Sequence, residues 1–159
     1  MVNGIVYYYE RFLRSGKFGI PSGAMVNGTL LPGNVEAYYS KALAKTLAET
    51  AHQSFVDFFN GKGVNTGITG PSLFSYLNAL DAKDATTSVL ISKEITTQFD
   101  VVKTKLDALT GEDLSNEVST QNANMIAVYN QMQIATRMLK VDMCSALSIT
   151  ITYTDNDGD

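Results

Sequence analysis

The feature of this sequence that most constrains its fold is an apolar pattern at helical spacing between residues 34 and 61. Pro32 and Gly33 oppose helix upstream, Asn34 is a favourable N-cap, and Gly61 is typical of a helix C-terminus. The apolar residues between them recur at Tyr39, Leu43, Leu47, Ala51, Phe55 and Phe59. A stripe of this period predicts one long helix with a buried face.

Two further long helices follow from the same periodicity. Capping residues at 84–88 precede a helix predicted to end at Leu109, and Ser115 is a plausible N-cap for a helix that runs to about Leu147. The predicted stripe of the first is Ile91, Ile95, Phe99, Val102, Leu106 and Leu109. That of the second is Met125, Val128, Met132, Ala135, Leu139, Met143 and Ala146. Methionine at these positions is more often core filling than a binding groove.

Shorter elements complete the pattern. Residues 5–13 read as a short helix, and residues 72–80 as another with Pro71 at its first position. Residues 15–33 are rich in glycine and proline, which predicts a long loop, and 149–153 (ITITY) predict an extended tail. The expected fold is all-α, an up-and-down bundle of about four main helices formed by residues 1–159 as a single domain.

Composition excludes several classes of function. The 159 residues are 45% hydrophobic and 18% charged, which is typical of a globular protein. The net charge of −4, without a lysine and arginine cluster, argues against a nucleic-acid partner. No apolar run is long enough for a transmembrane segment, and the N-terminal sequence lacks the pattern of a signal peptide. The single cysteine, Cys144, is expected to be a small buried residue.

Two stretches resemble a known family. The first contains a loop of the form FGIPxGA, a proline, then VEAYYS and FFNG within residues 17–61. The second is the chain end, KVDMCSALSITITYTDNDGD. Both resemble the C-terminal half of imelysin-like proteins, which are built from two related helical bundles. The resemblance implies an exported bacterial protein, periplasmic or lipid-anchored at the cell envelope, with a role in iron uptake. On that basis the chain is a C-terminal piece whose partner is the N-terminal half of the same protein.

The resemblance carries over no catalytic residue. The family motif Gly-x-His-x-x-Glu is absent, because the residues around His52 supply neither the glycine nor the glutamate. An enzymatic role for this chain alone is therefore not favoured. The alternative hypothesis is that the chain forms part of an imelysin-type metallopeptidase. No cofactor is expected in this chain, whereas the intact two-half protein could hold iron or another divalent metal. Glu36, Tyr38 and Tyr39 are expected to face the missing half.

Candidate metal ligands are weak. Glu49 and His52 form a Glu-x-x-His pair on one helix face, but a di-iron bundle needs a second such motif and further carboxylates. A hydrogen-bonded or surface histidine is the favoured interpretation. The terminal Asp155, Asp157 and Asp159 are expected to form a solvated acidic tail rather than a calcium loop. A third hypothesis is a non-catalytic interaction module, which exposed aromatic surface at residues 7–9 would support.

Overall fold

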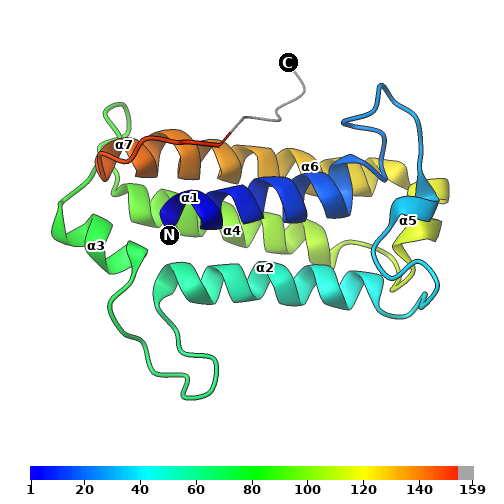
Figure 1. The fold of residues 1–159 in the computed structure, drawn as a ribbon, viewed down its shortest axis with the longest axis horizontal. Helices are drawn as coiled ribbons and strands as arrows, with labels where there is room; N and C mark the ends of the chain where they lie inside the picture. Colours follow the sequence, from blue (N-terminus) through cyan, green and yellow to red (C-terminus); the bar gives the residue numbers. More distant parts are fainter. Residues whose placement is uncertain (154–159) are drawn as a thin grey trace.

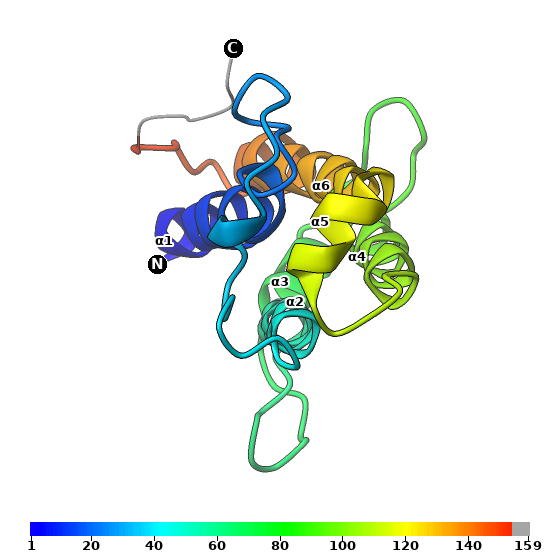
Figure 2. The same ribbon diagram turned by 90° about the vertical axis from the view of Figure 1, so that its right-hand side faces the viewer.

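The computed structural model describes residues 1–153, so the acidic tail that includes Asp155, Asp157 and Asp159 lies outside the described residues. The fold is all-helical, as predicted, and residues 1–153 contain no strand, only two isolated bridges. Four helical segments lie alongside one another (Figures 1 and 2). They are α2 (Ala44–Asn60), α4 (Ile91–Asp107), α6 (Asn122–Arg137), and α1 (Val2–Tyr7) with its continuation η1 (Tyr8–Gly19). No helix within these residues has the length and apolarity to cross a membrane.

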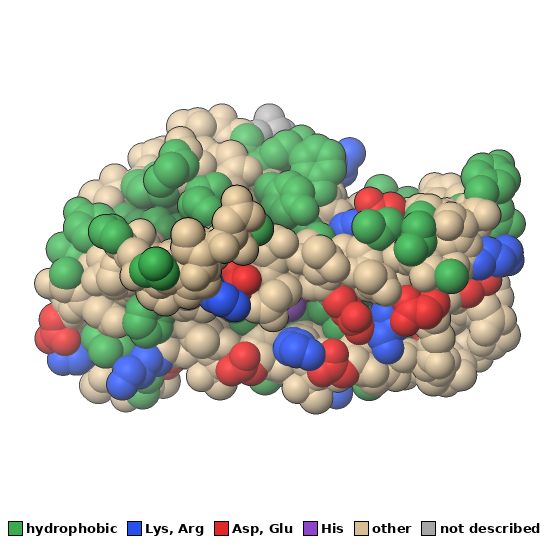
Figure 3. Space-filling model, turned by 90° about the horizontal axis from the view of Figure 1, so that it is seen from below, with side chains coloured by type: hydrophobic (Ala, Val, Ile, Leu, Met, Phe, Trp, Pro, Cys, Tyr) green, Lys and Arg blue, Asp and Glu red, His purple; other side chains and the backbone are tan. Residues whose placement is uncertain are grey.

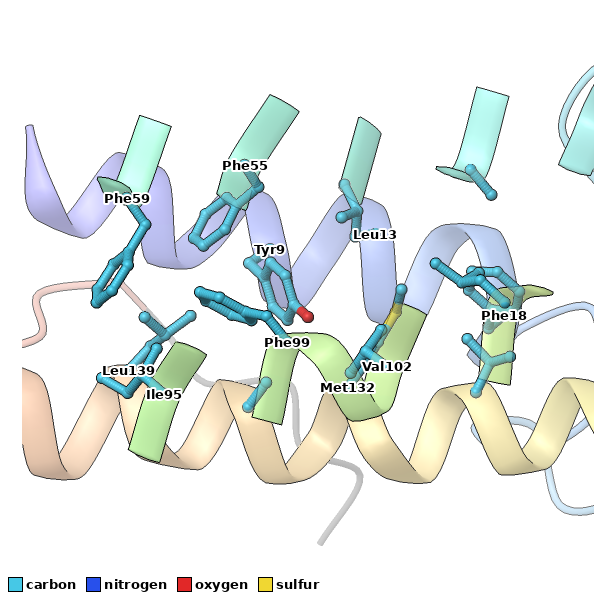
Figure 4. Packing of buried hydrophobic residues seen from close by; sticks show 14 of the residues in the cluster. Tyr9, Leu13, Phe18, Phe55, Phe59, Ile95, Phe99, Val102, Met132 and Leu139 are labelled. Atoms are coloured by element: carbon cyan, nitrogen blue, oxygen red, sulfur yellow. The ribbon is translucent and has the colours of Figure 1, made fainter. Parts of the chain in front are cut away.

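The core lies where these four segments meet, and its centre is aromatic (Figure 4). Every residue of the predicted α4 stripe is buried, from Ile91 to Leu109. The predicted stripe of the C-terminal helix is also buried through Met143, and only Ala146 is half-exposed. Cys144 is buried beside it, as expected. These positions confirm that the apolar period of 3.6 residues marks the core faces of α4 and α6.

The prediction for the start of α2 is wrong by nine residues, because the N-cap is Leu43 rather than Asn34 and the helix begins at Ala44. Ala37 has a φ of 56°, which interrupts helical geometry. The first turn of α2 is capped from a distant part of the chain. The Glu112 carbonyl accepts from the Lys45 N–H at 3.3 Å, and its carboxylate accepts from the Thr46 hydroxyl at 2.9 Å.

The buried face of α2 consequently differs from the predicted stripe. The residues that face the core are Ala44, Ala48, His52, Phe55 and Phe59. Only the last two of these were predicted, whereas Tyr39, Leu43 and Leu47 are exposed. The N-terminal half of the buried face contains two small alanines. The larger apolar residues next to them in the sequence, on a solvent-facing side of the helix, therefore dominate the apolar pattern and led to the wrong prediction.

The C-terminal helix is divided rather than continuous. Asp113, not Ser115, is the N-cap of α5 (Leu114–Thr120), and its carboxylate accepts from the Ser115 N–H at 3.0 Å. Gln121 separates α5 from α6, because its φ of −140° and ψ of 41° are not helical. Beyond α6 the chain continues through η3 (Met138–Met143), a π-helix, and α7 (Cys144–Ala146). The periodic stripe survives these changes because the break lies before its first residue, Met125.

The N-terminal helix is longer than predicted and shortens the glycine-proline loop. The helix does not end at Leu13 but continues as η1 to Gly19, so residues 15–19 are helical and not part of the loop. All of η1 is a π-helix, in which the N–H donates to the carbonyl five residues earlier. The Ile20 N–H continues this pattern to the Ser15 carbonyl at 2.9 Å. The loop then runs to η2 (Pro32–Asn34) and is held to α6 by Asn122, whose side chain donates to the Ser22 carbonyl.

The two connections on either side of α3 (Leu73–Ala79) fold in the same way. In the first, Gly63 N–H donates to the Ile68 carbonyl and Gly70 N–H to the Gly61 carbonyl. In the second, Asp84 N–H donates to the Val89 carbonyl and Ile91 N–H to the Ala82 carbonyl, the same bonds in the same order. Gly67 and Ser88 occupy equivalent positions with φ of 64° and 59°. These twin loops leave the bundle at the same end (Figure 1).

Helix α3 itself begins one residue later than predicted. Ser72 is its N-cap and forms a capping box with Ser75, so Pro71 precedes the cap instead of occupying the first helical position.

Substitution of Gly61 tests how tightly the first twin loop is closed. Gly61 ends α2 with a φ of 72°, and a Cβ there would lie 2.6 Å from the Gly70 carbonyl oxygen. Gly67 has a similar φ of 64°, but a Cβ there would meet open space. We expect Gly67→Ala to lower the free energy of unfolding by about 1–2 kcal/mol through backbone strain alone. Gly61→Ala should lower the free energy of unfolding by more than Gly67→Ala does, as measured by urea denaturation. Equal decreases would show that the backbone at Gly70 moves away to make room for the added Cβ.

The C-terminal residues 149–153, called the strap below, form neither helix nor strand and contact α1 and η1. Ile149, Ile151 and Tyr153 pack partly buried against the core. The Asn3 side chain binds the strap with both ends of its amide: its nitrogen donates to the Thr150 carbonyl at 3.0 Å, and its oxygen accepts from the Thr152 N–H at 3.2 Å. A side-chain amide thus takes the place of the missing partner strand.

Candidate functional site

His52, the only histidine, lies in the core rather than on a ligand-binding surface. It is 2% exposed, its Nε2 donates to the Phe99 carbonyl at 3.1 Å, and its ring contacts Tyr9 and Phe99. Burial lowers the pKa of His52 to about 4, and the bond to Phe99 opposes that change in part. The imidazole is therefore neutral at pH 7. Glu49 lies one turn away and forms an ion pair with Lys45 at 3.7 Å.

A shallow hollow of about 310 Å³ lies over His52 between α2 and α4. Its rim is charged, and Figure 3 shows the histidine between acidic and basic side chains. The charges are paired with one another, as in the contact of Lys103 with Asp107 at 2.8 Å. Within residues 1–153, no three His, Cys, Asp or Glu side chains are grouped so that they could hold a metal ion. The arrangement is that of an ion-paired helix surface.

A second surface carries a cluster of large aromatic side chains that are partly exposed to solvent. Tyr7, Tyr8 and Phe12, called the aromatic face below, project from α1 and η1 and are 37%, 40% and 54% exposed. Phe12 contacts both tyrosines, with ring centroids 5.9 Å from Tyr7 and 6.0 Å from Tyr8. The same helix buries Val6, Tyr9 and Leu13 against the core. The rings of the aromatic face project from other sides of the helix and do not reach the core. Figure 3 shows hydrophobic side chains gathered along one edge of the molecule, beside the charged band.

The aromatic face borders a hollow of about 330 Å³, called the aromatic hollow. Its lining residues are Tyr8, Phe12, Gly16, Lys17, Asn34 and Glu36. An ion pair between Lys17 and Glu36 crosses the hollow from η1 to the segment after η2. Burial raises the pKa of Tyr8, and the Glu36 charge raises it further, so the phenol remains a neutral hydrogen-bond donor. With two aromatic rings and an ion pair in its lining, the hollow could accept an apolar side chain that ends in a polar group.

The structure brings only one of the three predicted interface residues to this hollow. Glu36 lines it, whereas Tyr38 and Tyr39 lie further along, in the turns that replace the predicted helix start. Tyr39 is 97% exposed, and its ring packs edge-on against Tyr38 with centroids 5.2 Å apart. The Lys41 ammonium lies 5.7 Å from the Tyr38 ring centroid. These tyrosines extend the exposed aromatic surface without belonging to the hollow.

Phe12 and Lys17 are the site residues that sequence reasoning missed. Phe12 follows Tyr8 by four residues, a spacing that places both rings on one side of a helix, and this signal was present in the sequence. Lys17 carried no such signal, because it was assigned to the loop. No protein-family model, curated protein or solved structure matches the chain.

Proposed function

We propose that this chain is the second helical bundle of an imelysin-like exported protein, and that it is a binding component without catalytic residues of its own. In this proposal the four main helices run up and down, and the N-terminal bundle of the same protein docks on the aromatic face. The iron-related role and the location at the cell envelope come from the sequence resemblance. The exposure of Tyr7, Tyr8 and Phe12 beside a preformed hollow is the observation that carries the docking part of the proposal.

The chemistry of this surface favours a protein partner. Aromatic residues are enriched in the cores of protein interfaces, and a few of them, placed in or beside a pocket, contribute most of the binding free energy. Phe12 packs edge-on against Tyr7 and at a tilt against Tyr8, so little side-chain freedom would be lost on docking. The Lys17–Glu36 ion pair offers a polar anchor at the rim. A partner helix with an apolar side chain directed into the hollow fits this description.

The test begins with the reading frame upstream of Met1 in the source DNA. We expect it to encode a helical bundle with a Gly-x-His-x-x-Glu motif, which is then produced separately and titrated with this chain by calorimetry. Phe12→Asp should weaken the association about tenfold or more, because it places a charge in the centre of the interface. Tyr76→Asp is the matched control, since Tyr76 is 56% exposed on α3 and outside the aromatic face.

Three results would count against the proposal: no such bundle upstream, no association, or equal weakening by both variants. The same aromatic face also favours a second candidate function, a non-catalytic module that acts on its own by binding itself or another protein. Sedimentation of the isolated chain separates the two. A dimer that Phe12→Asp dissociates would support self-association, and a monomer that binds the upstream bundle would support the first proposal.

A further inference from the structure

A buried ionic centre on η1 lies beside the aromatic face, and Tyr153 contacts both of them. Its hub is Glu10, which is 2% exposed. The Glu10 carboxylate accepts a hydrogen bond from the Tyr153 hydroxyl at 2.8 Å and lies 3.3 Å from the Lys140 ammonium and 3.5 Å from the Arg14 guanidinium. A buried carboxylate is stable only with such partners, so each of these contacts restrains the position of Glu10.

The partners of Glu10 come from three separate segments. Arg14 belongs to η1 itself, Lys140 to the second π-helix η3, and Tyr153 to the strap. The centre therefore joins both π-helical segments of the chain to its C-terminal end. Single π-helical turns are often associated with function, and a continuous π segment of 12 residues is far longer than usual. Something outside the helix must hold η1 in this geometry.

The strap is placed to do so. Its Tyr153 ring contacts Tyr7 of the aromatic face, with centroids 5.0 Å apart, while its hydroxyl binds Glu10. Upstream, the Asn3 amide fixes Thr150 and Thr152 along α1. One side chain thus contacts both the exposed rings and the buried ionic centre.

We propose that the strap controls the helical register of η1 and thereby regulates docking on the aromatic face. With Tyr153 bound to Glu10, η1 keeps its π register. With the strap released, η1 relaxes to an α-helix, in which four residues rather than five close each hydrogen-bonded turn. That change rotates Phe12 relative to Tyr8 and shifts Lys17 relative to Glu36, so the aromatic hollow loses its shape. The regulatory role rests on the proposed docking function, whereas the register change does not.

The register is measured without any partner. Scalar couplings across hydrogen bonds, observed by nuclear magnetic resonance, identify the carbonyl that accepts from each N–H. In the native chain the Ile20 N–H should couple to the Ser15 carbonyl, five residues earlier, in keeping with their 2.9 Å bond. Tyr153→Phe keeps the ring and removes only the hydroxyl that binds Glu10. We expect it to shift this coupling to the Gly16 carbonyl and to speed amide exchange in η1 at least tenfold, with α4 unchanged.

Two controls separate this device from ordinary loss of stability. Tyr76→Phe removes an exposed phenol on α3 and should leave both the coupling and the exchange in η1 unchanged. Asn3→Ala loosens the strap without altering Glu10 and should reproduce the effect of Tyr153→Phe. An unchanged Ile20 coupling in Tyr153→Phe, or exchange that rises equally in η1 and α4, would overturn the proposal. Failure of this register test leaves the docking titration unaffected, so the two proposals fail separately.

Discussion

Replacing Phe99 by alanine is expected to lower the free energy of unfolding by about 3–5 kcal/mol. Phe99 is 1% exposed and lies at the centre of the aromatic core (Figure 4). Its ring centroid is 5.5 Å from that of Phe59, 5.7 Å from Phe55 and 5.8 Å from Tyr9. Four helical segments meet there, so none can collapse into the space without losing its other contacts. The loss should appear as a lower urea midpoint at pH 7.

Phe58 provides the matched control for this substitution. It is 44% exposed on α2, adjacent in sequence to the fully buried Phe59. Phe58→Ala removes the same atoms from a position that water already reaches, and we expect it to cost less than about 1 kcal/mol. If Phe99→Ala cost no more than Phe58→Ala, the aromatic cluster would not be the centre of the core.

The stability of the protein is expected to fall between pH 6.5 and pH 4 because of His52. Its pKa is lowered from 6.5 to about 4 in the folded chain, chiefly by burial. Within this window the unfolded chain binds a proton that the folded chain excludes, so stability rises with pH. The contribution is fully present above pH 6.5 and is lost as the pH falls toward 4. Its size is about 3 kcal/mol, from 1.36 kcal/mol for each pKa unit.

His52→Gln isolates this effect from the carboxylates that also titrate in acid. Glutamine does not titrate, and its side-chain nitrogen can still donate to the Phe99 carbonyl in place of Nε2. The difference in unfolding free energy between the native chain and the variant should therefore shrink or reverse as the pH falls from 7 to 4. A difference that stays constant would mean that His52 is protonated in the folded state and that its burial is relieved by local opening.

The parts of the fold that could be predicted are those where large apolar residues alone decide which face is buried. The stripe from Ile91 to Leu109 is such a case, because every fourth or third position is large and apolar. The start of α2 is the opposite case. Its cap, Glu112, is distant in sequence, and its buried residues Ala44 and Ala48 are too small to outweigh Leu43 and Leu47 in a hydrophobic pattern.

The site was predictable only in part for similar reasons. Glu36 was placed beside the glycine loop on the strength of a resemblance, and the structure does place it at a hollow, although in a turn and not on a helix. The π register of η1 has no signature in residue type, since the same side chains are compatible with an α-helix. Its support comes from Lys140 and Tyr153, more than a hundred residues away, and no local rule could reveal that connection.

The equivalence of the twin loops means that α3 and one loop could be deleted without changing how α2 connects to α4. Because the bonds that close residues 61–70 are the same as those that close residues 82–91, excision of 62–82 would join Gly61 to Lys83 within a loop of unchanged geometry. Neither α2 nor α4 would need a new junction, and only the packing of α3 on the end of the bundle would be lost. Among chains built on this plan, we expect length differences here to come as whole units of loop and helix rather than as single inserted residues.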